Sequence, residues 1–306
     1  MEKYTPADYT AETQDQRALV QELKQEPEIR EVFSAMHIPA AELDRHPYRL
    51  KRWLDRKKLC RGCTSLKNCR QAQRGFVEEP VYDGVLSMEL TPCRWLQEKQ
   101  QKEAHAVHFL VNDLPGNLRT AGFADLKTDK ESRAYLQALQ KAITAFMDRR
   151  SLYIYGNMGT GKTMIAACAV NDAARKGMKT AFVSMPRLSE RITASLRTGE
   201  YQTEVQRLCY ADFAVFDDIG AENVTDRYRA VLLGILDTRM QEGRMTWFTS
   251  NEDFASLKNH YILSMNHADI GDAERVLERI RAIGEPLELI GRDRRNLYST
   301  GKGDFK

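Results

Sequence analysis

The sequence predicts an α/β fold in which helices flank a parallel sheet, preceded by a smaller and mostly helical unit. Three observations support this fold class. From about residue 132, short apolar runs alternate with amphipathic segments, as in strands joined by crossover helices. A glycine-rich turn separates one apolar run from the helix that follows it. The first ninety-odd residues differ in composition, and 306 residues suffice for two domains.

The first unit shows helical periodicity and then a basic stretch. Residues 14–25 form a polar helical pattern. Residues 49–74 carry ten Lys and Arg side chains against a single acid. Residues 97–106 are polar and rich in Lys and Gln, as in a linker helix. We therefore place the domain boundary near residue 105, which gives domains of residues 1–105 and 106–306.

The second unit is expected to alternate helices and strands. An amphipathic helix precedes the first apolar strand, and a helix follows each of the next strands. The predicted strands are residues 151–155, 179–184, 211–216 and 245–249. The predicted helices are residues 135–146, 162–175, 186–197, 228–241 and 273–281.

The composition argues against a secreted or membrane protein. No run approaches the roughly 18 apolar residues of a membrane span, and the N-terminus lacks the basic and apolar regions of a secretory signal. We therefore expect a cytoplasmic protein with reduced cysteines and no membrane partner. The formal net charge of +3 is too small to indicate a partner by itself.

A candidate phosphate-binding loop lies between the first predicted strand of the second unit and the helix after it. Glycines allow the backbone N–H groups to point inward at a positive helix end, which makes an anion nest. The lysine of such a loop reaches the β- and γ-phosphates of ATP, and the hydroxyl after it binds Mg²⁺. The loop matches G-x-x-x-x-G-K-[ST] at every fixed position: Gly156, Asn157, Met158, Gly159, Thr160, Gly161, Lys162 and Thr163.

Polar side chains end two later strands. An apolar run ends in Asp217 and Asp218, and we expect its strand to lie beside the one that precedes the glycine loop. Asp217 is assigned to the metal, directly or through water, and Asp218 to orienting or deprotonating the attacking water. Asn251 closes another strand. Its amide either lies between the acids and the γ-phosphate or caps the next helix.

Arg275 and Arg279 are four residues apart on one face of a predicted helix. Arginines on a solvated helix usually pair with nearby glutamates. The alternative is an arginine finger that reaches the nucleotide of a neighbouring subunit and stabilises charge in the transition state. The spacing alone leaves both interpretations open.

Four cysteines of the first unit form a candidate metal site: Cys60, Cys63, Cys69 and Cys93. A Cys-x2-Cys spacing lets two sulfurs bind one tetrahedral ion, and a distant fourth ligand closes the site. Zinc is favoured over an iron–sulfur cluster because nothing nearby suggests redox chemistry. The alternative is four buried free thiols. Such a zinc ion would contribute folding energy rather than catalysis.

Taken together, these motifs resemble the DnaI/DnaC helicase loaders, which are AAA+ ATPases of bacterial replication and restart. The resemblance rests on the basic Cys-rich first unit, GNMGTGKT, FAVFDDIGAE, TSN and ERVLERIRAI, in this order over nearly the whole chain. It is nearest to the DnaI branch, which has a zinc-binding N-terminal domain. That family's zinc site includes a histidine, and none lies between Cys69 and Cys93 here.

The resemblance implies an AAA+ P-loop ATPase domain that binds ATP and Mg²⁺, preceded by a zinc-binding domain that holds the hexameric replicative helicase. The resemblance identifies the glycine loop as the Walker A motif. It likewise identifies Asp217 and Asp218 as the Walker B motif and Asn251 as sensor 1. Arg279 matches the arginine finger, with Arg275 one turn earlier. Sensor 2 is expected at Arg294 or Arg295, and we assign Arg295.

The implied function is ATP-dependent loading of the replicative DNA helicase onto single-stranded DNA during initiation or restart, within the primosome. The ATPase domains would self-associate through contacts between finger and nucleotide. The basic helix 186–197 lies where this family contacts single-stranded DNA, and Arg187, Arg191 and Arg197 are the candidates.

Three other interpretations remain open from the sequence. The chain could be another AAA+ DNA ATPase, such as a transposition helper of the IstB type, although the Cys-rich unit argues against it. It could be a P-loop kinase for a small molecule, which would not use an arginine from a second subunit. It could also be a zinc-dependent adaptor with a vestigial ATPase.

Overall fold

The computed structural model describes residues 6–129, 131–195, 198–263 and 267–294. The chain forms two compact units that divide between Lys102 and Glu103. Among the described residues, no helix is both long enough and apolar enough to cross a membrane.

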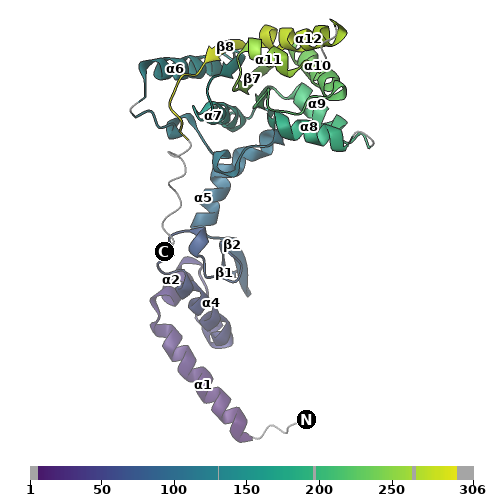
Figure 1. Ribbon diagram of the computed structural model, residues 1–306. Helices are drawn as coiled ribbons and strands as arrows, with labels where there is room; N and C mark the ends of the chain where they lie inside the picture. Colours follow the sequence, from purple (N-terminus) through teal and green to yellow (C-terminus); the bar gives the residue numbers. More distant parts are fainter. Residues whose placement is uncertain (1–5, 130, 196–197, 264–266, 295–306) are drawn as a thin grey trace, which may run out of the picture. The chain divides into compact units, whose positions relative to one another are not determined.

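The first unit, drawn in purple and blue in Figure 1, combines helices with a hairpin. Its core includes Leu23 from one helix and Leu50 and Trp53 from another, and all three are almost fully buried. Its elements are α1 (Pro6–Gln25), α2 (Pro27–Ala35), α3 (Ala41–Arg45), α4 (Pro47–Leu59), η1 (Leu66–Asn68), β1 (Phe76–Tyr82), β2 (Leu86–Pro92) and α5 (Arg94–Glu103).

The antiparallel hairpin of β1 and β2 was not expected, because its sequence is rich in charge and contains prolines. Pro80 pairs with Met88 in the middle of the hairpin. A strand of a two-stranded ribbon has an unpaired edge, and proline is tolerated at such an edge because it needs no donor there. The description of the first unit as mostly helical is therefore incomplete.

The second unit, drawn from teal to yellow in Figure 1, contains one parallel sheet with helices on both faces. Its strands are β3 (Phe109–Asn112), β4 (Leu152–Tyr155), β5 (Thr180–Ser184), β6 (Phe213–Asp217), β7 (Met245–Ser250) and β8 (Glu285–Glu288). Its helices are η2 (Ala104–His108), η3 (Gly116–Leu118), η4 (Phe123–Asp125), α6 (Arg133–Met147), α7 (Lys162–Arg175), α8 (Met185–Ala194), α9 (Tyr201–Tyr210), α10 (Asp226–Gln241), α11 (Phe254–His260) and α12 (His267–Ile283).

Alternation along the strands builds a core on each face of the sheet. In β6, Phe213 and Val215 pack with α6 and α7, whereas Ala214 and Phe216 pack with α8, α10 and α12. All four side chains are fully buried. A strand buried on both faces reads as a continuous apolar run, which is why the sequence indicated the central strands clearly.

The order of the strands is β3-β5-β6-β7-β4-β8, and neighbouring strands pair in parallel. The expectation that the acid-bearing strand β6 lies beside the glycine-loop strand β4 was wrong, because β7 lies between them. The carboxyl ends of parallel strands still meet at one edge of the sheet. The carboxyl ends of β6 and β7 therefore both lie at the same edge of the sheet as the glycine loop.

Candidate nucleotide-binding site

The loop from Gly156 to Thr163 leaves β4 and enters α7, as the motif requires. Gly156 has φ of 139°, and a Cβ there would lie 2.6 Å from the carbonyl oxygen of Leu289. Gly159 has φ of 82°, and a Cβ there would lie 2.2 Å from Asp293 Oδ1. Only glycine fits both positions, because positive φ and close neighbours both exclude a side chain.

The ammonium group of Lys162 is held at the mouth of this loop. Its Nζ donates to the carbonyl oxygens of Gly156 and Asn157, both at 2.8 Å, and to Asn251 Oδ1 at 2.9 Å. The side chain is buried, which strengthens its interaction with charge. The structure thus brings together the predicted lysine and the predicted sensor amide from the tip of β7.

Asp217 ends β6 with a buried carboxylate. Thr249 Oγ1 donates to Asp217 Oδ1 at 2.7 Å. Burial, together with the charge of Asp218, raises the pKa of Asp217 to about 7, although hydrogen bonds from Thr249 and Thr163 and the charge of Lys162 oppose this rise. The contact with Thr163 joins the two residues that the sequence assigned to Mg²⁺. A bound cation would favour the ionised carboxylate.

Thr249 is the functional residue that sequence reasoning missed. Its hydroxyl also accepts a hydrogen bond from the backbone N–H of Asp218 at 3.0 Å, and Asp218 has φ of 57°. Asp218 therefore occupies a left-handed conformation that β-branched residues avoid. One buried hydroxyl positions both acids. The signal was present in the triplet of Thr249, Ser250 and Asn251, of which only the last was assigned a role.

A cavity of about 350 Å³ opens over the loop. Its lining residues include Lys162 and Thr163 from the loop, and Asp218 and Asn251 from the strand tips. Asn117, Leu118 and Arg294 also line it. Lys162, Thr163 and Asp218 therefore lie around one hollow that is large enough for a nucleotide, whereas Asp217 is not among its lining residues.

Arg294 enters this cavity from the segment after β8, while Arg295, the assigned sensor, lies outside the described residues. Arg294 Nη2 lies 2.9 Å from Glu131 Oε1, and both side chains are buried. Its guanidinium carbon lies 3.9 Å from the centre of the Tyr135 ring. Its backbone N–H donates to the carbonyl oxygen of Gly159 at 2.8 Å, which ties this segment to the glycine loop.

Arg275 and Arg279 lie on α12, and neither is among the described residues that line the cavity. Arg279 Nε donates to Asp237 on α10, which raises the pKa of Arg279. Arg275 Nη1 lies 3.3 Å from Asp272 Oδ1 and is largely exposed. Both arginines therefore pair with aspartates of the same chain, whereas the interpretation as a solvated helix expected nearby glutamates. A role toward a second subunit stays a prediction.

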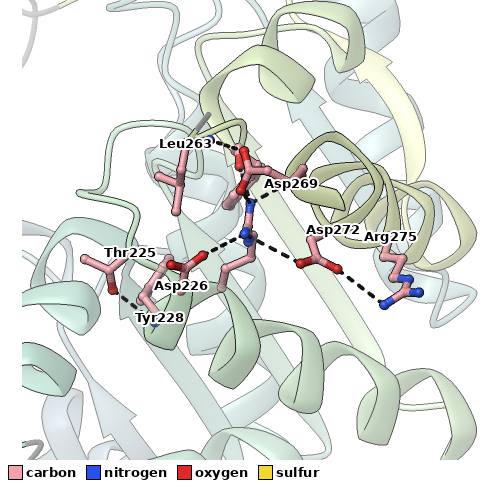
Figure 2. A network of polar contacts seen from close by, with 9 residues as sticks. Thr225, Asp226, Tyr228, Leu263, Asp269, Asp272 and Arg275 are labelled. Atoms are coloured by element: carbon pink, nitrogen blue, oxygen red, sulfur yellow. Dashed lines mark hydrogen bonds and ion pairs between the residues drawn. The ribbon is translucent and has the colours of Figure 1, made fainter. Parts of the chain in front are cut away.

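A buried arginine, Arg229 on α10, fixes the start of α12 (Figure 2). Its guanidinium lies 2.7 Å from Asp269, 2.8 Å from Asp226 and 3.7 Å from Asp272. Because Asp272 also binds Arg275, this network connects the buried charge to the predicted companion of the finger residue Arg279. Arg229 was not singled out from the sequence, since its partners on α12, Asp269 and Asp272, are distant in the chain.

The basic helix expected at residues 186–197 is α8, which ends at Ala194. Arg187 is exposed. Arg191 instead binds Asp113 at 2.9 Å and also Glu204, so its charge is already paired. Arg197 lies outside the described residues. Of the two candidates for DNA phosphates that the structure describes, Arg187 is the exposed one and Arg191 is half-buried.

The four cysteines of the first unit are free and line one cavity of about 200 Å³. Gln71 Nε2 donates to Cys60 Sγ at 3.1 Å, and the N–H of Gly75 donates to Cys69 Sγ at 3.4 Å. Among the described residues, however, no group of three or more His, Cys, Asp or Glu side chains is arranged to hold a metal ion. The four thiols therefore share one pocket but are not arranged as a metal-binding group in this geometry, and the zinc site stays a prediction.

A glycine loop at the start of α7 and acids at the tip of another parallel strand of the same sheet define a P-loop nucleotide-binding protein. The chain belongs to the family of IstB-like ATP-binding proteins, whose family model matches residues 112–284. This match lies within the second unit. It shows an ATP-binding class, consistent with the motifs found in the sequence.

Similar proteins include a replicative helicase loader and an ATP-binding protein of an insertion sequence. The replicative helicase loader DnaI of Bacillus subtilis (strain 168) is 27% identical over 259 residues, covering 81% of this chain and 82% of that protein. A putative ATP-binding protein of the insertion sequence IS1162 from Pseudomonas fluorescens is 30% identical over 91 residues, covering 30% of this chain and 39% of that protein.

Two solved structures share the fold. A crystal structure of DnaI has a TM-score of 0.54 and 25% identity, covering 60% of this chain and 98% of that chain. A putative primosome component from Streptococcus pyogenes serotype M3 has a TM-score of 0.52 and 25% identity, covering 64% of this chain and all of that chain. These matches are consistent with an AAA+ type of ATPase domain in the second unit.

Proposed function

We propose that this protein uses ATP to load the replicative DNA helicase onto single-stranded DNA. The observation that carries the proposal is the extent of similarity to the DnaI loader, which covers 81% of this chain. The second unit is only two-thirds of the chain, so the similarity must extend into the first unit. A shared ATPase core alone would not produce similarity in the first unit.

The ATPase chemistry is assigned to residues around the cavity. Lys162 would bind the β- and γ-phosphates, and Thr163 and Asp217 would hold Mg²⁺. Bound Mg²⁺ supplies positive charge that offsets the charge developing on the phosphates. Asp218, which faces the cavity, would orient or deprotonate the attacking water. Asn251 and Arg294 would contact the γ-phosphate end, and this gives Arg294 the part assigned to Arg295 from the sequence.

The remaining roles belong to surfaces rather than to the cavity. The first unit would bind the hexameric helicase, as the loader similarity suggests. Arg279, supported by Arg275, would reach the nucleotide of a second copy, which requires it to leave Asp237. Arg187 on α8 would contact single-stranded DNA through its phosphates.

Zinc in the first unit is part of this proposal. Four free thiols that share one cavity are the donor set that zinc prefers, and hydrogen bonds from N–H groups to Cys60 and Cys69 suit thiolates. A structural ion there would tie the hairpin to the end of α4, because Cys60 follows α4 and Cys93 follows β2.

The test mixes the full chain with the hexameric replicative helicase of its host, a circular single-stranded DNA, and ATP with Mg²⁺. We expect a stable complex with the helicase, and helicase bound to the circle only when ATP is present. Lys162→Ala should still bind the helicase but fail to transfer it. Absence of any complex, or equal transfer by Lys162→Ala, would contradict the proposal.

A transposition helper is the second candidate, favoured by the family match and by the insertion-sequence relative. That relative's similarity covers only 30% of this chain, which the ATPase core alone can explain. A helper of this kind should stimulate strand transfer by a transposase and should not bind the replicative helicase. The same mixing experiment therefore separates the two candidates.

A further inference from the structure

Asn171 is a buried polar side chain of α7 that the proposed chemistry does not use. It is fully buried, and its Nδ2 donates to the carbonyl oxygens of Leu118 at 2.8 Å and Ala121 at 2.9 Å. Its Oδ1 lies 3.2 Å from Nε2 of His105, which is also buried. One amide thus joins α7 to two segments that precede it by fifty residues or more.

Further donors hold the same segment. His105 Nε2 lies 3.1 Å from the carbonyl oxygen of Arg119, and Arg175 Nη2 donates to that of Thr120 at 2.7 Å. Both neighbours of His105 Nε2 are acceptors, so this nitrogen carries the proton. Donors from α7 and His105 therefore engage the carbonyl oxygens of four successive residues, 118–121. Such a segment has a fixed position relative to α7.

The segment that is held in this way forms part of the nucleotide cavity. Asn117 and Leu118 line that cavity together with Met164 of α7. Asn171 follows Lys162 by nine residues, so it lies about 13 Å further along the helix axis than the phosphate lysine. An amide and two apolar side chains suit the edge and face of a base and not a phosphate.

We propose that Asn171, together with His105, positions residues 116–121 as the wall that holds the nucleoside part of the bound nucleotide. Asn171 is a positioning residue, because it contacts the wall and not the cavity. Asn171 would set the affinity for the base and sugar. The binding of the phosphates by Lys162 would not depend on it. This inference rests on the proposed nucleotide site and adds to it the residues that recognise the nucleoside.

The test compares two probes with the full chain in the presence of Mg²⁺: ATP, and inorganic tripolyphosphate, which carries phosphates without base or sugar. We expect Asn171→Ala to weaken ATP binding by about tenfold, the scale of one or two lost hydrogen bonds, and to leave tripolyphosphate binding unchanged. His105→Leu, which removes one donor, should weaken ATP binding by a smaller factor. It provides a second variant if Asn171→Ala folds poorly.

Val170→Ala is the matched control, because Val170 is the buried neighbour of Asn171 and packs in the core without hydrogen bonds from its side chain. It should lower stability while leaving the ratio of ATP to tripolyphosphate affinity unchanged. Equal weakening of both probes in Asn171→Ala and His105→Leu, or no weakening of ATP in either, would overturn the inference. Failure of the unaltered protein to bind ATP would overturn the nucleotide site itself and this inference with it.

Discussion

Replacing Thr249 by valine tests how the two acids are positioned. The substitution keeps the shape of the side chain and removes one hydroxyl. That hydroxyl donates to Asp217 Oδ1 at 2.7 Å and accepts from the N–H of Asp218 at 3.0 Å. Since Thr249 is fully buried, water does not replace either partner.

The expected loss can be worked from these two contacts. A hydrogen bond to a charged group contributes about 1.5–3 kcal/mol and one between neutral groups about 0.5–1.5 kcal/mol, which gives a total of about 3 kcal/mol. Asp218 would also lose the contact that fixes its left-handed backbone. A misplaced water-orienting group would lower ATP turnover by about tenfold to a hundredfold.

Hydrogen exchange at the amides of β6 and β7 measures the local opening free energy without interference from the first unit. ATP turnover is measured on the same preparations. Thr249→Ser is the control, since it keeps the hydroxyl and loses one methyl group, which costs about 1 kcal/mol. If Thr249→Val matched Thr249→Ser both in amide hydrogen exchange and in ATP turnover, the hydroxyl would not hold the acids. That result would refute this reasoning.

Three further predictions follow from the site and the first unit. In the metal-free protein the pKa of Asp217 rises from 3.8 to about 7, so the folded state binds more protons than the unfolded state between these values. The free energy of unfolding should therefore fall by roughly 2–3 kcal/mol more in the unaltered protein than in Asp217→Asn as the pH rises from about 5 to 8, in denaturant titrations with a chelator present. Arg279→Ala should bind ATP normally and lose most hydrolysis; full turnover by this variant would remove the role of a second subunit. Metal analysis should find one zinc ion per chain and a large loss in Cys63→Ser; a metal-free unaltered protein would instead leave the thiols as free side chains.

The sequence predicted the phosphate site because its residues are close together in the chain. The helix after the glycine loop was expected at residues 162–175, and α7 has these bounds. The central strands were predicted because both of their faces are buried, which makes them continuous apolar runs. Local patterns were sufficient for this helix and for the central strands.

Edges and distant contacts could not be predicted in this way. Strands β3 and β8 have four residues each and lie at the edges of the sheet, where part of each strand is exposed. The position of β7 between β4 and β6 depends on strand pairing, which leaves no mark within a single strand. Thr249 and Arg294 gain their partners only when segments more than thirty residues apart meet.

The most direct test of the account is equilibrium binding of ATP in the presence of Mg²⁺, measured for the unaltered protein and for Lys162→Ala. Lys162 is the cation at the mouth of the glycine loop, held by two loop carbonyl oxygens and Asn251. The account predicts saturable binding by the unaltered protein and affinity lower by at least about tenfold in the variant. No binding by the unaltered protein, or equal binding by both, would contradict it.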